Sequence, residues 1–208
     1  MPAGSFDHEK YKNRLTELIN EVTNEDFNIL LQKIFDGPIL NMFLRAPGSM
    51  KLHHNYIGGL LEHTIDVTEL SMLIASKNKN IDTNLIITGA LLHDIGKISE
   101  ISTAIGFPYT TEGKLLGHIP LSILIIQKAA ISLNIPSTKL VELEHIIISH
   151  HGDLEKGSPV PCLSKEAFIV HYADEINAIM NQFDKPKESK ETFEYNNMLK
   201  RALYKKDN

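Results

Sequence analysis

Residues 83–97 read TNLIITGALLHDIGK. Its apolar residues predict a buried helix that is capped by Thr83 or Asn84 and ends at His93-Asp94, just before Gly96. Histidine and aspartate are ligands of divalent transition metals, and an adjacent pair lets one helix end serve two ions at once. Side chains at a helix terminus are held rigidly yet face a cleft, which suits preorganised chemistry. This stretch therefore indicates a metal site at the end of a buried helix.

The same residue types recur in a fixed order on both sides of this helix. A single His-Asp dipeptide arises easily by chance, but here it stands among other candidate ligands at predicted helix ends. These ligands are His63 before it, and His118, His150-His151 and Asp174 after it. The order favours metal-dependent hydrolysis.

Most of the remaining chain is also predicted to be helical, because apolar residues return with the 3.6-residue period. The stretches 98–113 and 152–162 contain glycines and prolines and are expected to be loops. Neither an internal repeat nor an alternating strand pattern is present, so the predicted fold class is all-α. Helices are expected over residues 11–22, 25–35, 39–44, 59–76, 118–133, 137–150 and from 164 onwards, the last carrying Asp174.

The 208 residues, 42% of them apolar, are enough for one well-buried core with a terminal extension. Residues 1–45 are interpreted as an N-terminal helical extension and residues 46–183 as the main domain. Residues 184–208 are interpreted as a charged tail, in which the amphipathic segment 193–204 is expected to dock back as a helix.

Composition excludes several classes of protein. Cys162 is the only cysteine, so an internal disulfide is impossible and a reducing cytoplasm fits. The first eight residues lack the features of a signal peptide, and the apolar run at residues 123–126 is too short to span a bilayer, so no membrane partner is expected.

The net charge of −5 argues against a large sequence-independent nucleic-acid surface. It leaves room for a phosphate-bearing substrate, because two bound divalent cations would reverse the local sign of the site.

The order His, His-Asp, Asp resembles the HD superfamily of metal-dependent phosphohydrolases, and the interposed His118 and His150 resemble its two-metal subset. Longer strings are similar to the HD half of bacterial 3′–5′ exoribonucleases, in which an OB-fold domain precedes the HD domain. The similarity spans about residues 43–174, with a weaker echo at 199–204. The strings are KLHHNYIGGLLEHT (51–64), TTEGKLLGH (110–118), ISHHG (148–152), GSPVP (157–161) and HYAD (171–174).

This resemblance implies a single HD-domain helical bundle with two divalent ions. The first ion would be held by His63, His93, Asp94 and Asp174. Asp94 would bridge both ions, because a carboxylate offers two oxygens. His118 and His150 would hold the second ion, while His151 either joins them or orients water or phosphate. The ligand types suit manganese, iron, cobalt or zinc better than calcium or magnesium.

Two further residues are expected at the substrate. Lys97 can be interpreted as a helix C-terminal lysine, but the resemblance implies that it binds the scissile phosphate and stabilises charge on the transferred group. His54 lies beside Tyr56 and a Gly-Gly pair, and it either contacts substrate or faces solvent. His145 and His171 fall on apolar helical faces and are expected to be structural.

The predicted activity is phosphoester hydrolysis, with a nucleotide or short single-stranded RNA or DNA as substrate partner. The sequence departs from the exoribonucleases because nothing before Tyr56 shows the alternating strands of an OB-fold. A cyclic-dinucleotide or mononucleotide phosphohydrolase is the alternative, although residues 152–159, GDLEKGSP, replace the Gly-Tyr-Pro signature of the cyclic-dinucleotide enzymes. A non-catalytic nucleotide-binding module is a second alternative, but such modules typically lose ligands that are all present here.

Overall fold

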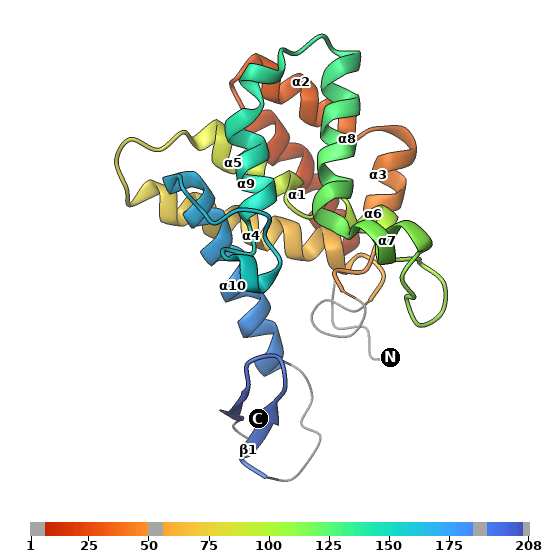
Figure 1. Cartoon of the computed structure of the whole chain (residues 1–208), viewed down its shortest axis with the longest axis vertical. Helices are drawn as coiled ribbons and strands as arrows, with labels where there is room; N and C mark the ends of the chain where they lie inside the picture. Colours follow the sequence, from red (N-terminus) through yellow and green to blue (C-terminus); the bar gives the residue numbers. More distant parts are fainter. Residues whose placement is uncertain (1–6, 50–55, 185–190, 206–208) are drawn as a thin grey trace.

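The computed structural model describes residues 7–49, 56–184 and 191–205 of the chain, and the prediction of an all-α bundle is confirmed. Figure 1 shows the helices gathered in one body, with a small hairpin at the far end of the last helix. The elements are α1 His8–Glu21, α2 Glu25–Ile34, α3 Gly37–Phe43, α4 Gly59–Ser76, α5 Thr83–Leu92, α6 Lys97–Glu100, α7 Thr111–Leu116, α8 His118–Ser132, the 3-10 turn η1 Ser137–Lys139, α9 Val141–Ser149, the 3-10 turn η2 Leu154–Lys156, α10 Lys165–Asp184, β1 Phe193–Asn196 and β2 Arg201–Tyr204.

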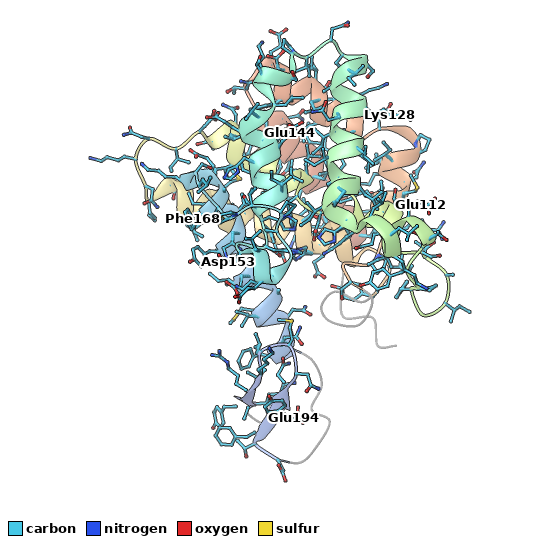
Figure 2. All side chains as sticks on the ribbon, in the orientation of Figure 1. Glu112, Lys128, Glu144, Asp153, Phe168 and Glu194 are labelled. Carbon is cyan, nitrogen blue, oxygen red and sulfur yellow. The ribbon has the colours of Figure 1, made fainter. Side chains whose placement is uncertain are left out.

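Helix α5 forms the centre of the bundle. Every residue from Leu85 to Leu92 is buried, as expected of a helix that is apolar on all sides. Helices α4, α9 and α10 pack around it, and α1 and α2 also contact it. The buried apolar residues form one hydrophobic cluster, whose members come from positions between Leu15 and Ala173. The N-terminal helices therefore share the core of the main domain. By contrast, charged side chains such as Lys128 and Glu112 point outward from the bundle (Figure 2).

The predicted cap of α5, Thr83 or Asn84, is wrong by one or two residues. Asp82 is the N-cap, and its side chain accepts a hydrogen bond from the backbone N–H of Leu85 at 3.1 Å. Asn84 instead accepts from the backbone N–H groups of Thr23 and Asn24, at 2.7 and 3.0 Å. Asn84, predicted as a candidate cap of its own helix, therefore connects the central helix to the start of α2.

The stretch 98–113, expected to be a loop, contains all but the first residue of α6 and the start of α7. An antiparallel bridge between Ile101 and Tyr109 closes the turn between these helices. The Thr110 hydroxyl caps α7 by accepting from the backbone N–H of Gly113 at 2.9 Å. Helices of four and six residues are too short to show a helical period, which is why the sequence pattern missed them.

The prediction that residues 193–204 form a docking helix is wrong. They form an antiparallel hairpin in which Phe193 pairs with Tyr204 and Asn196 with Arg201. Aromatic residues alternate with polar ones in the first strand, which favours a strand. Leu203 is buried, and Asn196 Nδ2 donates to Gln182 Oε1 on α10 at 3.3 Å, so the hairpin is fastened to the last helix.

Among the described residues, no helix is both long and apolar enough to cross a membrane.

Candidate metal centre

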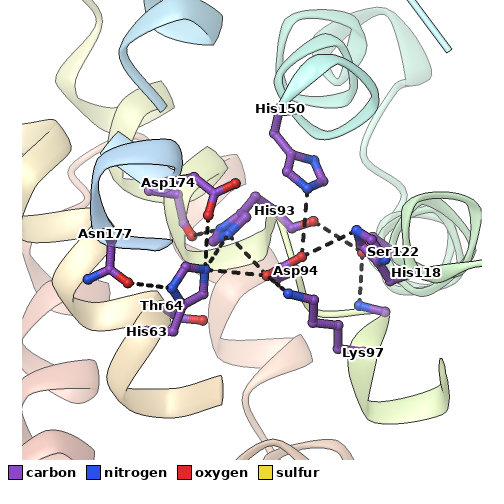
Figure 3. Close-up of polar contacts among 12 residues, drawn as sticks. His63, Thr64, His93, Asp94, Lys97, His118, Ser122, His150, Asp174 and Asn177 are labelled. Atoms are coloured by element: carbon purple, nitrogen blue, oxygen red, sulfur yellow. Dashed lines mark hydrogen bonds and ion pairs between the residues drawn. The ribbon is translucent and has the colours of Figure 1, made fainter. Parts of the chain in front are cut away.

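The predicted ligands converge from different helices on the end of α5 (Figure 3). His93 and Asp94 directly follow α5, and His63 comes from the second turn of α4. His118 begins α8 and His150-His151 follow α9, while Asp174 lies in the middle of α10. Residues separated by more than a hundred positions thus surround one carboxylate.

Asp94 lies at the centre of the cluster and its two oxygens face different partners. Oδ2 lies 3.5 Å from Nε2 of His63 and 3.3 Å from Nε2 of His93. Oδ1 lies 3.5 Å from Nε2 of His118 and 3.7 Å from Nε2 of His150. The side chain is almost completely buried. The two oxygens of Asp94 therefore face two separate groups of imidazole nitrogens.

The potential ligand atoms form two compact groups. In one, the donor atoms of His63, His93 and Asp94 all lie within 4.8 Å of one another, and Asp174 Oδ1 lies 3.1 Å from His63 Nε2. In the other, the same limit holds for His118 and the His150-His151 pair. Buried clusters of this composition fit the binding of divalent metals.

The histidines present Nε2 to the cluster because Nδ1 is engaged on the opposite side of each ring. A donor hydrogen on Nδ1 leaves the Nε2 lone pair available to a metal. The partners are Asn177 Oδ1 for His63 (2.7 Å), the Ala90 carbonyl for His93 (2.7 Å), Glu100 Oε1 for His118 (3.2 Å), the Ile147 carbonyl for His150 (2.7 Å) and the Lys156 carbonyl for His151 (3.1 Å).

Three polar atoms of the cluster are buried without a hydrogen-bond partner in the described part of the chain. They are Asp94 Oδ1, His118 Nε2 and His150 Nε2. Buried polar atoms are nearly always paired in folded proteins. All three can act as electron-pair donors, and they face one another, so the residues present fit a cation.

The electrostatics favour the neutral, metal-binding form of His150 and His151. Burial, together with the neighbouring His151, holds the pKa of His150 well below its usual range. Burial and His118 likewise lower the pKa of His151. Neutral imidazole is the form that binds a metal.

The carboxylates are ionised in spite of their burial. Burial works to raise the pKa of Asp94, but the charge of Lys97 and the adjacent imidazoles hold it well below its usual range. Asp174 also has a lowered pKa, because its contact with His63 outweighs burial. For His63 itself, burial works to lower the pKa, but Asp174 and Asp94 raise it to about 9. The two buried carboxylates therefore keep their charge, and a bound cation would take the place of the proton that they favour on His63.

Lys97 begins α6 and its Nζ pairs with Asp94 Oδ2. Burial works to lower the pKa of this ammonium group, but the carboxylates of Asp94 and Asp174 raise it, so Lys97 is charged. It lines a pocket of about 250 Å³ together with Asp94, His151 and Asp174. The ammonium group of Lys97 thus contacts an acidic side chain at the site, that of Asp94.

Sequence reasoning missed Glu100 and Asn177. Glu100 is buried, and its Oε1 accepts from the backbone N–H of His118 at 3.0 Å in addition to its contact with Nδ1. It fell in an expected loop, where no pattern pointed to it. Asn177 lies one helical turn after Asp174, and that spacing was the available signal for a residue on the same face.

The remaining histidines named from the sequence are His54, His145 and His171. His54 lies outside the described residues. His145 Nε2 accepts from the backbone N–H of Leu163 at 3.0 Å, and His171 Nδ1 donates to the carbonyl of His150 at 2.7 Å, so both make structural hydrogen bonds.

Comparison with known proteins agrees with this geometry. The HD domain model matches residues 60–179, more than half of the chain and the whole span that carries the described cluster. No solved structure gives a significant match. HD domains bind divalent metals and are generally metal-dependent phosphohydrolases. With most of its length matched and the defining histidines and aspartates converging on one carboxylate, the chain belongs to the HD domain family.

Proposed function

We propose that this chain is a two-metal phosphodiesterase that removes nucleotides from the 3′ end of short single-stranded nucleic acid. The two-metal part rests on one observation. The two carboxylate oxygens of Asp94 face two separate groups of histidines. The nucleic-acid part rests on the resemblance of the long strings at residues 51–64 and 110–118 to exoribonuclease HD domains.

In this proposal, one ion would be held by His63, His93, Asp94 and Asp174. A second would be held by Asp94, His118 and His150, and His151 would either complete that set or contact phosphate. When bound, the two cations would supply a hydroxide nucleophile near neutral pH and Lewis-acid stabilisation of the phosphoryl oxygens. The ligand types favour manganese, iron, cobalt or zinc.

The protein contributes orientation and charge around these ions. Outer hydrogen bonds fix each imidazole ring, which avoids reorganisation during the reaction. Lys97 is charged and lines the same pocket as Asp94, so it is placed to contact a phosphoryl oxygen. A fixed cation beside the reacting phosphorus stabilises the charge that builds in the transition state.

A labelling experiment tests the direction and substrate class. The metal-loaded protein is incubated with a 5′-labelled single-stranded RNA, and the same RNA carrying a 3′-phosphate serves as the blocked control. We expect a ladder of shortened labelled products from the free 3′ end and strong inhibition by the block. Immediate release of a labelled mononucleotide would reverse the direction. Cleavage only of cyclic dinucleotides or mononucleotides, offered in parallel, would replace the proposed substrate.

Metal analysis tests the number of ions. We expect two ions per chain in the wild type and about one in His118→Ala, because only one group loses a ligand. Asp94→Asn, which neutralises the shared carboxylate, should lose both ions and all hydrolysis. One ion in both the wild type and His118→Ala would show that the site is mononuclear.

A further inference from the structure

The pocket above Asp94 has one wall that comes from outside the span matched by the HD domain model. Met198, in the turn of the β-hairpin, lines the pocket together with Asp94, Lys97 and Asp174. The family match ends at residue 179, so Met198 lies beyond it. The hairpin, which projects from the end of α10 in Figure 1, therefore contributes directly to the site.

The hairpin turn is held to the helix that carries Asp174. Asp174, Ala178 and Gln182 lie four residues apart and so follow one face of α10. Gln182, at the end of this row, accepts a hydrogen bond from Asn196 Nδ2 at 3.3 Å. Asn196 Oδ1 in turn accepts from the backbone N–H of Leu199 at 2.9 Å. These two bonds close the turn and set the position of Met198.

The pocket lining combines charged and apolar side chains. Lys97 and Asp94 are charged, as are Lys156, Asp174 and Glu175, and the phosphate of a substrate is expected beside Lys97. Ala178 and Met198 are the apolar members of the lining. A methionine thioether contacts aromatic rings favourably and adapts to rings of different shape. At about 250 Å³, the pocket is smaller than most small-molecule sites, so it would hold the terminal nucleotide while the rest of a longer substrate lies outside it.

From this arrangement we propose that Met198 is the nucleobase contact of the site, so that the hairpin selects substrates whose terminal phosphate carries a nucleoside. The inference rests on the proposed function, which supplies the nucleotide. The base packs against Met198 and Ala178 while its phosphate lies near Lys97. Because a thioether makes no directional hydrogen bond to a base edge, this contact distinguishes a base from no base and discriminates little among the bases.

Equilibrium binding measures this contact without requiring turnover. The full-length, metal-loaded protein is titrated calorimetrically with AMP and with ribose 5-phosphate, which lacks the base. We expect Met198→Ala to weaken AMP binding about five- to tenfold, the scale of one sulfur–aromatic contact, and to leave ribose 5-phosphate binding unchanged. Met180→Ala is the matched control, because Met180 is exposed on α10 and does not line the pocket. If AMP is turned over, KM replaces the dissociation constant.

The outcomes separate this inference from the proposed function. Base-dependent binding that needs Met198, in a protein that hydrolyses no phosphodiester, would support the subsite and overturn the exonuclease proposal. Equal wild-type affinity for the two ligands, or an equal loss for both in Met198→Ala, would overturn the subsite even if hydrolysis is observed. Unchanged AMP binding in Met198→Ala would overturn it as well.

Discussion

Asp94 and Lys97 form an ion pair that belongs to the site more than to the stability of the fold. Their ion pair is buried, and each side chain favours the charged form of the other. A buried pair contributes little net stability, because desolvation offsets most of the attraction. Its presence beside an unsatisfied carboxylate oxygen is therefore better explained by the site than by the fold.

Lys97→Ala tests the role of the ammonium group. We expect turnover to fall roughly a hundredfold or more, with metal content near that of the wild type, because Lys97 would contact substrate and not metal. Lys139→Ala is the control, since Lys139 pairs with Asp26 in an exposed ion pair on the surface. Steady-state kinetics and elemental analysis on the same preparations give both quantities. Unchanged turnover with a full complement of metal would remove Lys97 from the mechanism.

Glu100→Ala tests the support of His118. The variant loses the oxygen that accepts from the His118 backbone N–H and faces its Nδ1, so the ring can rotate away from Asp94. Loss of such an outer partner costs about 10- to 100-fold in metal affinity. We expect this loss at one of two sites when the apoprotein is titrated with Zn²⁺, and a smaller loss in Glu100→Gln, which keeps an acceptor oxygen.

Glu112→Ala provides the control for that titration, because Glu112 is exposed on α7, outside the cluster (Figure 2). Equal affinities in wild type and Glu100→Ala would mean that Glu100 serves only as the N-terminal cap of α8.

At the scale of elements, the turn after Asp94 must approach α8 closely. A Cβ at Gly96 would lie 2.1 Å from the carbonyl oxygen of His118 and 2.6 Å from the backbone nitrogen of Ser122. Gly96 also donates its backbone N–H to Ser122 Oγ at 2.8 Å. Since these neighbours are largely backbone atoms, they cannot rotate away. A glycine is therefore required where the two helices bring Asp94 and His118 together.

Gly96→Ala should displace the start of α8 and draw His118 away from Asp94. We expect a loss of about 1–3 kcal/mol in unfolding free energy, or roughly 2–12 °C in Tm for a chain of this size, together with weaker metal binding. Gly89→Ala is the comparison, because its Cβ would meet only the Ile146 side chain, which can move. Thermal unfolding and metal titration of both variants decide the matter. Equal behaviour of the two would show that the α6–α8 approach is adaptable.

At the scale of the whole molecule, the cluster joins helices from distant parts of the chain. Helices α4, α5, α8, α9 and α10 each position at least one member, either within the helix or directly after it. A cation that binds this arrangement binds the folded state and not the unfolded chain. Metal binding and global stability are therefore linked.

Removal of metal should lower the thermal stability of the entire bundle. A free metal concentration 100-fold above the dissociation constant stabilises by about 2.7 kcal/mol per site, or roughly 5–10 °C in Tm for this length. Calorimetry with a chelator, and again after Mn²⁺ or Zn²⁺ is restored, measures the difference. Asp94→Asn should show no metal-dependent rise. A wild-type Tm that is the same in all conditions would mean that the cluster holds no ion.

The sequence by itself determined the all-α class, the buried central helix and the identity of the candidate ligands. Apolar periodicity within α5 is a local property, and the chemistry of His93 and Asp94 does not depend on the rest of the chain. The order of the other candidate ligands, histidines and aspartates, was likewise visible in the sequence alone. Short elements were not, because four or six residues carry too little period, and the hairpin was mistaken for a helix.

Only the tertiary structure decided what supports the ligands and what surrounds the substrate. His63 finds its Nδ1 partner in Asn177, 114 residues away, and His118 finds its partner in Glu100, within an expected loop. Met198 reaches the pocket through a hairpin fastened to α10. Residue type and spacing report which atoms can bind a metal. Nearby carbonyls hold His93, His150 and His151, but the directions of the His63 and His118 rings depend on residues far along the chain, and no local pattern encodes those contacts.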